Sequence, residues 1–262
     1  MTAICYVLAF LIGSAFAQAT MIEDYLKAMQ ERRFSNEDDT RDFAQIHISA
    51  SIDTVIERCT RFIKRGSADR EVLAYVHVRR ARWVRSFEDR IRDYENALEL
   101  TTQGAAYVHV EMAQAYATQD WASAMQHFDK AIALNSRDPY TLFKRARVHQ
   151  QANENELALR DFDTVIALVP RKASAYIQRA TIQRGLGDME RSLQDYHKAF
   201  ELAEPQFIKN TQWNLKEKGY YTGETDGVYR EAFRNAVASC IKDEKCKSPV
   251  FAWTFETSPD RP

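Results

Sequence analysis

Hydrophobic positions recur every 34 residues between about residues 50 and 204. Four segments there end alike, with an aromatic residue, a small or β-branched residue and a leucine in the same register. They are DYENALEL at 93–100, HFDKAIAL at 127–134, DFDTVIAL at 161–168 and DYHKAFEL at 195–202. A small residue lets two helices cross closely, while the nearby aromatic ring fills the gap beside the crossing. The pattern predicts an all-α chain whose helical pairs share one continuous core.

A partial match precedes each of these helices. The matches are AYVHV at 74–78, MAQAYA at 112–117, LFKRARV at 142–148 and AYIQRATI at 175–182. Together with the connection GLGDMERSLQDY at 185–196, they resemble the tetratricopeptide repeat (TPR) family. The resemblance implies a helical-hairpin solenoid of four repeats, preceded by a degenerate half-repeat at 51–67. Such a solenoid is a binding scaffold that contributes no chemistry by itself.

In the TPR family the first helix of each hairpin lines a concave groove. The resemblance places the following residues on that groove: Tyr75, Arg79, Arg82, Tyr107, Gln114, Tyr140, Phe143, Arg147, Ile177 and Arg184. Arginine beside tyrosine suits carboxylate groups, so we expect a protein partner that offers an acidic or C-terminal peptide. An ordinary solvated helical face is the alternative interpretation.

Glycines gather after the repeats, in KEKGYYTGETDGVYREAF at 216–233. We predict a helix that Gly219 stops in a left-handed capping conformation, followed by a turn through TGETDG. A second helix then begins, with Phe233, Val237 and Ile241 on one face at four-residue spacing. The segment is therefore expected to form a small unit of two helices and a loop.

The cysteines predict one bridge and one buried thiol. Within a continuous helix the Cα atoms of Cys240 and Cys246 would be about 9 Å apart, beyond the disulfide reach of about 7 Å. A disulfide, which an oxidising compartment favours, therefore requires the helix to end between them, near Lys242. Cys59 lies at a core-facing position, where an unreactive buried thiol is expected.

A second resemblance covers about residues 206–241. Its motif consists of Gln212, Leu215, Gly219, Tyr220, Tyr221, Gly223, Asp226 and Gly227, followed by Ala236 and Val237. This spacing is similar to the peptidoglycan-binding-like domain of bacterial cell-wall proteins. The resemblance implies contact with glycan, for which the candidate residues are Tyr220, Tyr221, Gly223, Asp226 and Gly227. This chain has Arg230 and Phe233 where the family usually has Gly and Thr.

The N-terminus, MTAICYVLAFLIGSAFAQA, indicates export. Residues 2–19 carry no charged side chain, and the apolar run at 3–12 is too short to span a bilayer. A small-residue cleavage motif follows at 15–17, so we expect a signal peptide and a periplasmic or secreted protein without a membrane span after cleavage. An uncleaved anchor is the alternative. Residues 21–45 predict a short amphipathic helix and a polar link that cap the solenoid.

Composition and motifs add mainly exclusions. The chain has 262 residues with 36 Lys and Arg against 37 Asp and Glu, so no net field attracts nucleic acid. No His falls in a metal-site spacing, and no GxSxG, Walker or dinucleotide motif occurs, so we expect no metal, cofactor or catalytic site. His77 and His109, on neighbouring first helices, are expected to be ordinary surface residues. Among the acids of the glycine-rich loop, Asp226 precedes a glycine, which is typical of a turn.

We therefore expect an all-α exported protein that ends in a small helical module. The expected parts are a signal peptide at 1–17, an N-terminal helix and linker at 18–49, the TPR solenoid at 50–204, the peptidoglycan-binding-like module at 205–247 and a tail at 248–262. The leading hypothesis is a non-enzymatic periplasmic adaptor that binds a protein partner and contacts peptidoglycan. The alternatives are a pure protein-interaction scaffold, and a regulatory or catalytic component of cell-wall hydrolysis that uses Glu224, Asp226 and Glu231.

Overall fold

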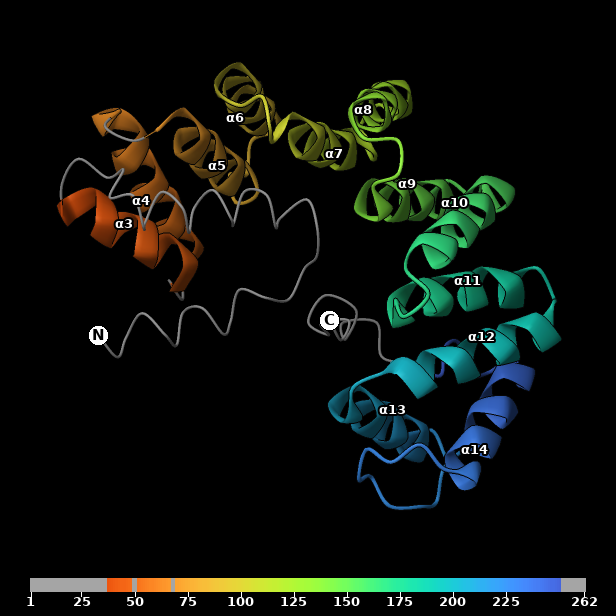
Figure 1. Ribbon diagram of the computed structural model, residues 1–262. Helices are drawn as coiled ribbons and strands as arrows, with labels where there is room; N and C mark the ends of the chain where they lie inside the picture. The colour runs from red at the N-terminus through yellow and green to blue at the C-terminus, as the bar shows by residue number, and fades with distance from the viewer. Residues whose placement is uncertain (1–36, 49–50, 67–68, 251–262) are drawn as a thin grey trace. The chain divides into compact units, whose positions relative to one another are not determined.

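The structure, a computed structural model, describes residues 37–48, 51–66 and 69–250, and its regular elements there are all α-helices (Figure 1). In chain order they are α3 (Glu37–Ile48), α4 (Ile52–Arg65), α5 (Arg70–Ala81), α6 (Phe87–Leu100), α7 (Ala105–Tyr116), α8 (Trp121–Leu134), α9 (Pro139–Gln151), α10 (Asn155–Leu168), α11 (Ala173–Gly185), α12 (Met189–Leu202), α13 (Pro205–Glu217) and α14 (Glu231–Lys242). None of the helices in these ranges is long and apolar enough to cross a membrane. The expected signal peptide lies outside the described residues.

The 34-residue period is confirmed in the second helices of the four hairpins. Helices α6, α8, α10 and α12 each have 14 residues, and they begin at residues 87, 121, 155 and 189. Their recurring aromatic residues are at most 3% exposed, and the small residues at 97, 131, 165 and 199 are fully buried. The recurring leucine position is different, since Leu134 is 58% exposed. The aromatic and small positions therefore build the core, and the leucine position does not do so consistently.

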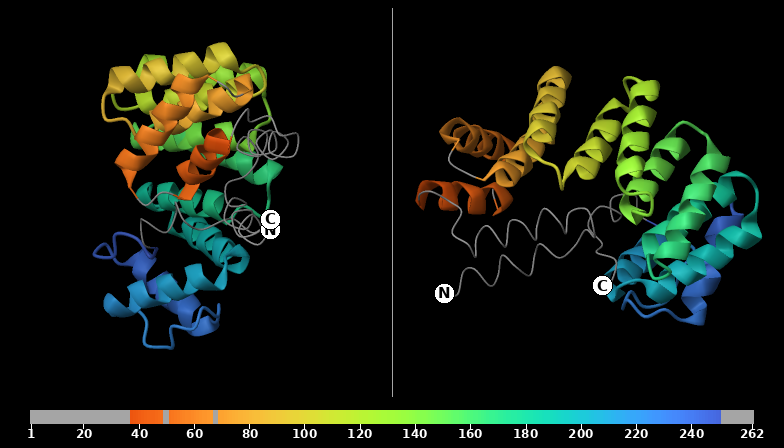
Figure 2. Two further views of the ribbon diagram at one scale, coloured as in Figure 1. Left: turned by 90° about the vertical axis from the view of Figure 1, so that its left-hand side faces the viewer. Right: turned by 45° about the horizontal axis from the view of Figure 1, so that its top comes forward.

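The chain divides into two compact units, and the division falls within α9, between Lys144 and Arg145. In the N-terminal unit the hairpins α3/α4, α5/α6 and α7/α8 follow one another, with α4 against α5 and α6 against α7. In the C-terminal unit α10 contacts α11, α11 pairs with α12, and α14 packs on both α12 and α13. Each unit thus repeats the same local packing of antiparallel helices (Figures 1 and 2).

The segment before α4 corrects the expectation of a polar link. Residues 37–48 form α3, whose Phe43 and Ile46 are each 1% exposed in the first hydrophobic core. The acids that made the segment look like a linker are paired, because Arg65 contacts Asp39 and Asp42 at 2.6 Å each. Helix α3 therefore completes the half-repeat at 51–67 as a full hairpin.

The C-terminal helices share a hydrophobic core with the last repeat. Phe200 of α12 lies at the centre, with its ring centroid 5.0 Å from that of Phe233 and 6.0 Å from those of Phe207 and Tyr229. Phe233, Val237 and Ile241 are buried on one face of α14, as their spacing predicted. The module is thus docked on the repeat through aromatic contacts.

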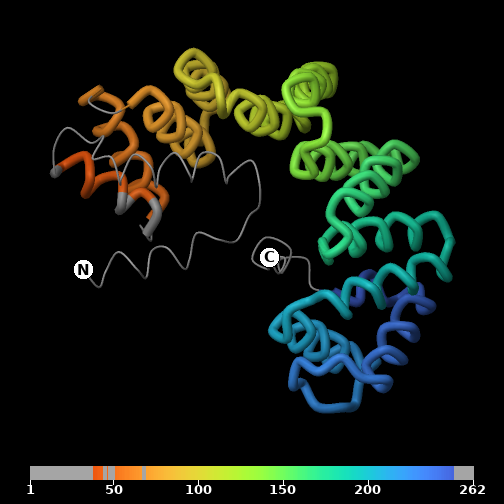
Figure 3. The backbone as a smooth tube through the Cα atoms, viewed as in Figure 1, coloured from red at the N-terminus to blue at the C-terminus, as the bar shows by residue number. Residues whose placement is uncertain are grey.

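A glycine-rich loop connects α13 to α14 (Figure 3). Gly219 stops α13 with φ of 79°, as predicted, and the amides of the next two residues bond back to the Leu215 carbonyl. Gly227 also has positive φ, and a Cβ there would lie 2.5 Å from the Pro205 carbonyl oxygen. Glycine is required at position 223 for close packing, because a Cβ there would overlap the Tyr221 ring. The glycines therefore serve backbone geometry and close packing.

Cys240 and Cys246 form a disulfide with their Cα atoms 5.2 Å apart. Helix α14 ends at Lys242, between the two cysteines, as the bridge requires. Cys59 is fully buried and unpaired, and burial raises the pKa of its thiol to about 12. A thiol in that state is not a nucleophile at neutral pH.

Candidate functional site

Three of the predicted groove residues donate to a buried carboxylate that sequence reasoning missed, and a fourth joins them through Arg82. Glu111, on α7, is 7% exposed and accepts hydrogen bonds from Arg82 at 2.9 and 3.0 Å. The Tyr140 hydroxyl also donates to it at 3.1 Å, and Gln114 donates at 3.4 Å. Arg82 also donates to the Tyr107 hydroxyl. Its guanidinium carbon lies 5.6 Å from the centroid of the Tyr107 ring. The predicted arginine–tyrosine face is therefore a self-contained polar cluster.

The charges of Glu111 and Arg82 neutralise each other within this cluster. Burial by itself would raise the pKa of Glu111, but the charge and hydrogen bonds of Arg82 lower it overall. The carboxylate therefore stays ionised, and it neutralises the arginine that was expected to receive an acidic peptide. Arg82 is thus not an open cation for a carboxylate ligand.

The other predicted groove residues are scattered. Tyr75 and Arg79 lie half-buried on α5, where Arg79 donates to the Ile46 carbonyl at 3.4 Å. Phe143 and Arg147 lie half-buried on α9, and no ion pair of Arg147 is present in the described part of the chain. Ile177 is not on an open face at all, because it is 2% exposed in the C-terminal core.

Arg184 has a different role from the predicted one. Its guanidinium donates to the carbonyls of Ile241, Asp243 and Lys247 at 3.1, 3.0 and 2.8 Å. The Ile241 carbonyl lies in the last turn of α14, where helix carbonyls lack intrahelical partners, and the other two lie in the segment that follows the helix. Arg184 therefore ties the C-terminal module to the last repeat and is not available to a partner.

A buried pair 16 residues apart recurs in the hairpins. Arg179 contacts Asp195 through two hydrogen bonds of 2.7 Å, and Arg145 contacts Asp161 through two of 2.8 Å. In α5/α6 the same register holds His77 and Asp93, 2.8 Å apart, with Arg80 as a second partner. The signal was present in the sequence, because Asp93, Asp161 and Asp195 keep the 34-residue step.

Hairpin α7/α8 breaks this register. The two positions hold Glu111 and His127, which turn to other partners: Glu111 to Arg82, and His127 to His109. The Nδ1 atoms of His109 and His127 are 3.1 Å apart, and the Tyr116 ring stacks on His127 at 5.5 Å. Burial lowers the pKa of both imidazoles, that of His127 to about 4. The expectation of an ordinary surface histidine is wrong for His77, which is 7% exposed and contacts Asp93.

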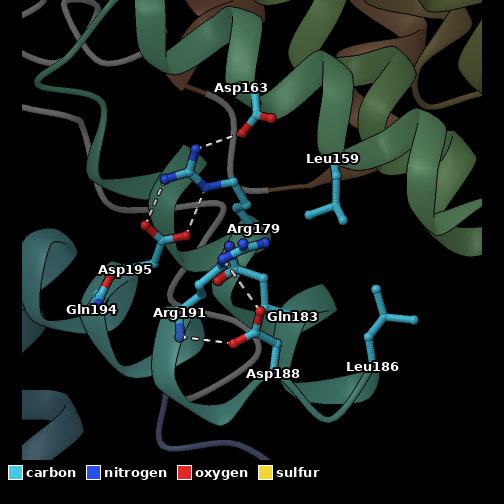
Figure 4. Close-up of a pocket in the computed structure, with 9 residues that line it drawn as sticks. All are labelled: Leu159, Asp163, Arg179, Gln183, Leu186, Asp188, Arg191, Gln194 and Asp195. Carbon is cyan, nitrogen blue, oxygen red and sulfur yellow. Dashed lines mark hydrogen bonds and ion pairs between the residues drawn. The ribbon is translucent and has the colours of Figure 1, made fainter.

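An open pocket with a volume of about 580 Å³ lies in the C-terminal unit, between α10 and the α11/α12 hairpin (Figure 4). Arg179 holds one side of it, between Asp163 at 2.6 Å and Asp195 at 2.7 Å. Leu159 and Leu186 lie on the opposite side (Figure 4). The other lining residues are Gln183, Asp188, Arg191 and Gln194. The pocket is therefore lined mainly by polar and charged side chains, with apolar surface on one side.

Gln183 is the unusual residue of this pocket. Its side chain is 9% exposed, yet its Oε1 accepts no hydrogen bond among the described residues. A buried acceptor without a donor costs about 1–3 kcal/mol of stability. The neighbouring Leu186 is 54% exposed, so an apolar surface lies open beside this unsatisfied acceptor. Leu186 thus offers apolar contact to a ligand, whereas Gln183 Oε1 lies beneath the pocket surface.

The predicted glycan residues of the C-terminal module make internal contacts. Tyr220 donates to Asp243 at 2.7 Å, whereas Tyr221 is 3% exposed and donates to the Glu224 carbonyl at 3.0 Å. Asp226 accepts from the Val228 amide at 3.0 Å and from Arg230. The two departures from the family pattern are therefore structural, since Arg230 pairs with Asp226 and Phe233 lies in the core.

Gln212, which belongs to the motif but not to the predicted glycan set, organises this loop. Its side chain is fully buried, accepts from the Gly227 amide at 2.8 Å and donates to the Val228 carbonyl at 3.0 Å. It also donates to Asp226 at 3.3 Å. The motif thus specifies the loop conformation, and the surface that remains exposed on this module includes Trp213, at 52%, and Val228, at 50%.

Asp226 is held by hydrogen bonds from within the C-terminal module. Hydrogen bonding from the Val228 amide, together with Arg230, lowers the pKa of Asp226, which disfavours a general acid. In the described ranges no group of three or more His, Cys, Asp and Glu side chains is placed to hold a metal ion. Among the sites described above, the pocket around Gln183 combines an open volume with exposed apolar surface.

Comparison with known proteins bears on the fold only. No protein-family model matches the chain, and no curated protein matches it. Among solved structures, the C-terminal part of a TPR repeat-containing protein from Cytophaga hutchinsonii is similar, with 16% identity and a TM-score of 0.52 over 87% of this chain and 92% of that one.

MamA is also similar, with 20% identity and a TM-score of 0.47 over 58% of this chain and 88% of that one. YrrB, described as a TPR protein with an unusual peptide-binding site, has 14% identity and a TM-score of 0.44 over 68% and 91%. The likeness to the Cytophaga structure, together with the 34-residue hairpins, establishes the TPR-type helical solenoid as the fold of this chain.

Proposed function

We propose that this protein is an exported, non-enzymatic adaptor that binds a protein partner through its helical hairpins. The observation that carries the proposal is the pocket between α10 and α11/α12, where a buried acceptor without a donor lies beside open apolar surface. A solenoid of hairpins is a scaffold for binding, and this pocket places the exposed apolar surface of Leu186 beside Gln183.

The chemistry of the pocket favours an extended peptide segment. Gln183 Oε1 is closed to solvent, so its side chain has to turn toward the pocket for a backbone N–H of such a segment to satisfy it. An apolar side chain of the segment covers Leu159 and Leu186. Both flanking carboxylates already pair with Arg179, so the ligand needs no charge of its own at that point. We therefore replace the acidic peptide expected on Arg82 with an apolar peptide at this pocket.

Export to the periplasm remains part of the proposal. Its support is the uncharged, apolar N-terminus with a small-residue cleavage motif, together with the Cys240–Cys246 disulfide, which persists in oxidising compartments. Fractionation of the native protein tests this part. Recovery of the full, uncleaved chain in the cytoplasm would contradict it.

Photo-crosslinking in living cells tests the pocket. A benzophenone amino acid replaces Leu186, 54% exposed at the pocket, or as a matched control Leu134, 58% exposed at the end of α8. We expect one discrete crosslinked product from position 186 and none from position 134. Adding Gln183→Met, which removes the acceptor at nearly the same side-chain volume, should abolish the product. Equal products from both positions would refute binding at this pocket.

Contact with peptidoglycan is a second candidate, favoured by the exposed Trp213 of the C-terminal module. Tryptophan presents a large amphipathic face of the kind that packs on sugar rings. Co-sedimentation of the mature chain with purified peptidoglycan tests it, and Trp213→Ala should remove the protein from the pellet. Tyr220→Phe is the control, because the Tyr220 hydroxyl is engaged by Asp243. A chain that stays in solution would leave only the protein-binding scaffold.

A further inference from the structure

Two histidines face each other in hairpin α7/α8, which lacks the buried pair found in α5/α6, α9/α10 and α11/α12. His109 on α7 and His127 on α8 are both half-buried, with their Nδ1 atoms 3.1 Å apart and their ring centroids 5.3 Å apart. This hydrogen bond requires one ring to donate and the other to accept. Neither ring hydrogen-bonds to any other group in the described ranges, so each Nε2 is left to solvent.

The spacing matches that of two imidazoles on one metal ion. Zinc–nitrogen bonds of about 2.0–2.1 Å place two ligand nitrogens roughly 2.9 Å apart at a right angle and roughly 3.4 Å apart at the tetrahedral angle. The observed 3.1 Å lies between these values. To direct both lone pairs at a shared ion, each ring turns by roughly 40° from the line joining the nitrogens.

From this geometry we propose that His109 and His127 form a binding site for a late first-row divalent metal ion, such as Ni²⁺, Cu²⁺ or Zn²⁺, with water completing the coordination. Imidazole nitrogen suits these ions, whereas Mg²⁺ and Ca²⁺ prefer oxygen. Binding changes the Nδ1–H ring to the Nε2–H tautomer, and water carries that proton, so no net proton is released at neutral pH. The site is not expected to bind as tightly as a four-ligand structural site.

The surroundings explain this limit. Lys130, on α8, adds positive charge to both rings. Tyr116 stacks on His127 with an interplanar angle of 7°, which holds that ring in place. Glu95 and Asp120 act on the Tyr116 hydroxyl, and neither is among the charges that shift the pKa of the two imidazoles. A two-histidine site of moderate affinity, held between two packed helices, follows from this arrangement.

Calorimetry with Ni²⁺ and Zn²⁺ on tag-free, chelator-treated full-length protein tests the proposal. We expect one ion per chain, with affinity about 100-fold weaker in His109→Gln or in His127→Phe, which keeps the ring against Tyr116. His197→Gln is the control, because His197 is also half-buried but lies on α12. Absence of binding to the parent, or unchanged affinity in both site variants, would overturn the site.

A measurement on the unsubstituted protein covers the case of a variant that does not fold. Substoichiometric Ni²⁺ is paramagnetic, so it should broaden the imidazole proton resonances of His109 and His127 before those of any other histidine. Broadening that begins at another histidine would overturn the proposal.

Discussion

The hairpins α11/α12 and α7/α8 share their helix register, a 14-residue second helix and a buried aromatic residue within it. They differ at the pair of positions that faces across the hairpin. In α11/α12 these positions hold Arg179 and Asp195, which neutralise each other inside the hairpin. In α7/α8 they hold Glu111 and His127, which find separate partners. The period that builds the fold therefore leaves this pair free to vary, and the variation creates local chemistry.

The largest expected effect comes from breaking the regular pair. Arg179→Met leaves the Asp195 carboxylate, 6% exposed, without its bidentate partner, and should lower the free energy of unfolding by about 3 kcal/mol. Urea denaturation measures the loss, and hydrogen exchange should accelerate in α11/α12. Arg191→Met, at a 75% exposed side chain, should have almost no effect. If both variants lose equal stability, the buried pair is not what holds this hairpin.

Recovery by a second substitution sharpens that test. Arg179→Met combined with Asp195→Leu should regain most of the lost stability, because no buried charge then remains unpaired. A double variant as unstable as the single one would show that Arg179 acts through packing alone.

Hairpin α7/α8 should be less sensitive to the loss of Arg82, the arginine after α5 that pairs with Glu111. Arg82→Met removes the main partner of Glu111, but Tyr140 and Gln114 still donate to the carboxylate. We therefore expect a loss of about 2 kcal/mol by urea denaturation. Arg85→Met, at an exposed arginine of the same connection, is the control. A larger loss than in Arg179→Met would reverse the comparison.

Lowering the pH should destabilise α7/α8 more than α11/α12. The folded-state pKa of His127 is about 4, below the ordinary 6.5, because burial and His109 disfavour its charged form. The unfolded chain then binds more protons below pH 6.5, so stability falls as the pH drops from about 6.5 toward 4. Discounted for half exposure, the loss is on the order of 1–2 kcal/mol. Urea denaturation of metal-free protein at several pH values measures this loss, and His127→Phe should reduce the dependence of stability on pH between 6.5 and 4. The same dependence in His127→Phe would contradict the role of His127.

The smallest expected change is a gain in stability at the pocket. Gln183→Met removes a buried acceptor that lacks a donor, and should raise the free energy of unfolding by about 0.5–1 kcal/mol. Gln194→Met, at an exposed glutamine of the same pocket, should leave stability unchanged. A loss of stability in Gln183→Met would mean that its amide is satisfied in the native protein. A gain, together with loss of crosslinking, is the pattern expected of a binding residue.

The sequence by itself determined the architecture of this protein. A 34-residue period of aromatic and small residues predicts helices that start at fixed intervals, because burying these side chains requires the same hairpin each time. Local chemistry likewise predicted the stop at Gly219 and the end of α14 between Cys240 and Cys246, since both depend on residues within one helical turn or two.

Only the tertiary structure decided the partners of the long charged side chains. Arg82 reaches Glu111 across 29 residues, and Arg184 reaches the disulfide loop across nearly 60, so neither contact has a signature in local spacing. An arginine at a groove position looks the same in sequence whether it faces a ligand or a buried carboxylate. The desolvation of each charge selects its partner, and that depends on which helices fold against it.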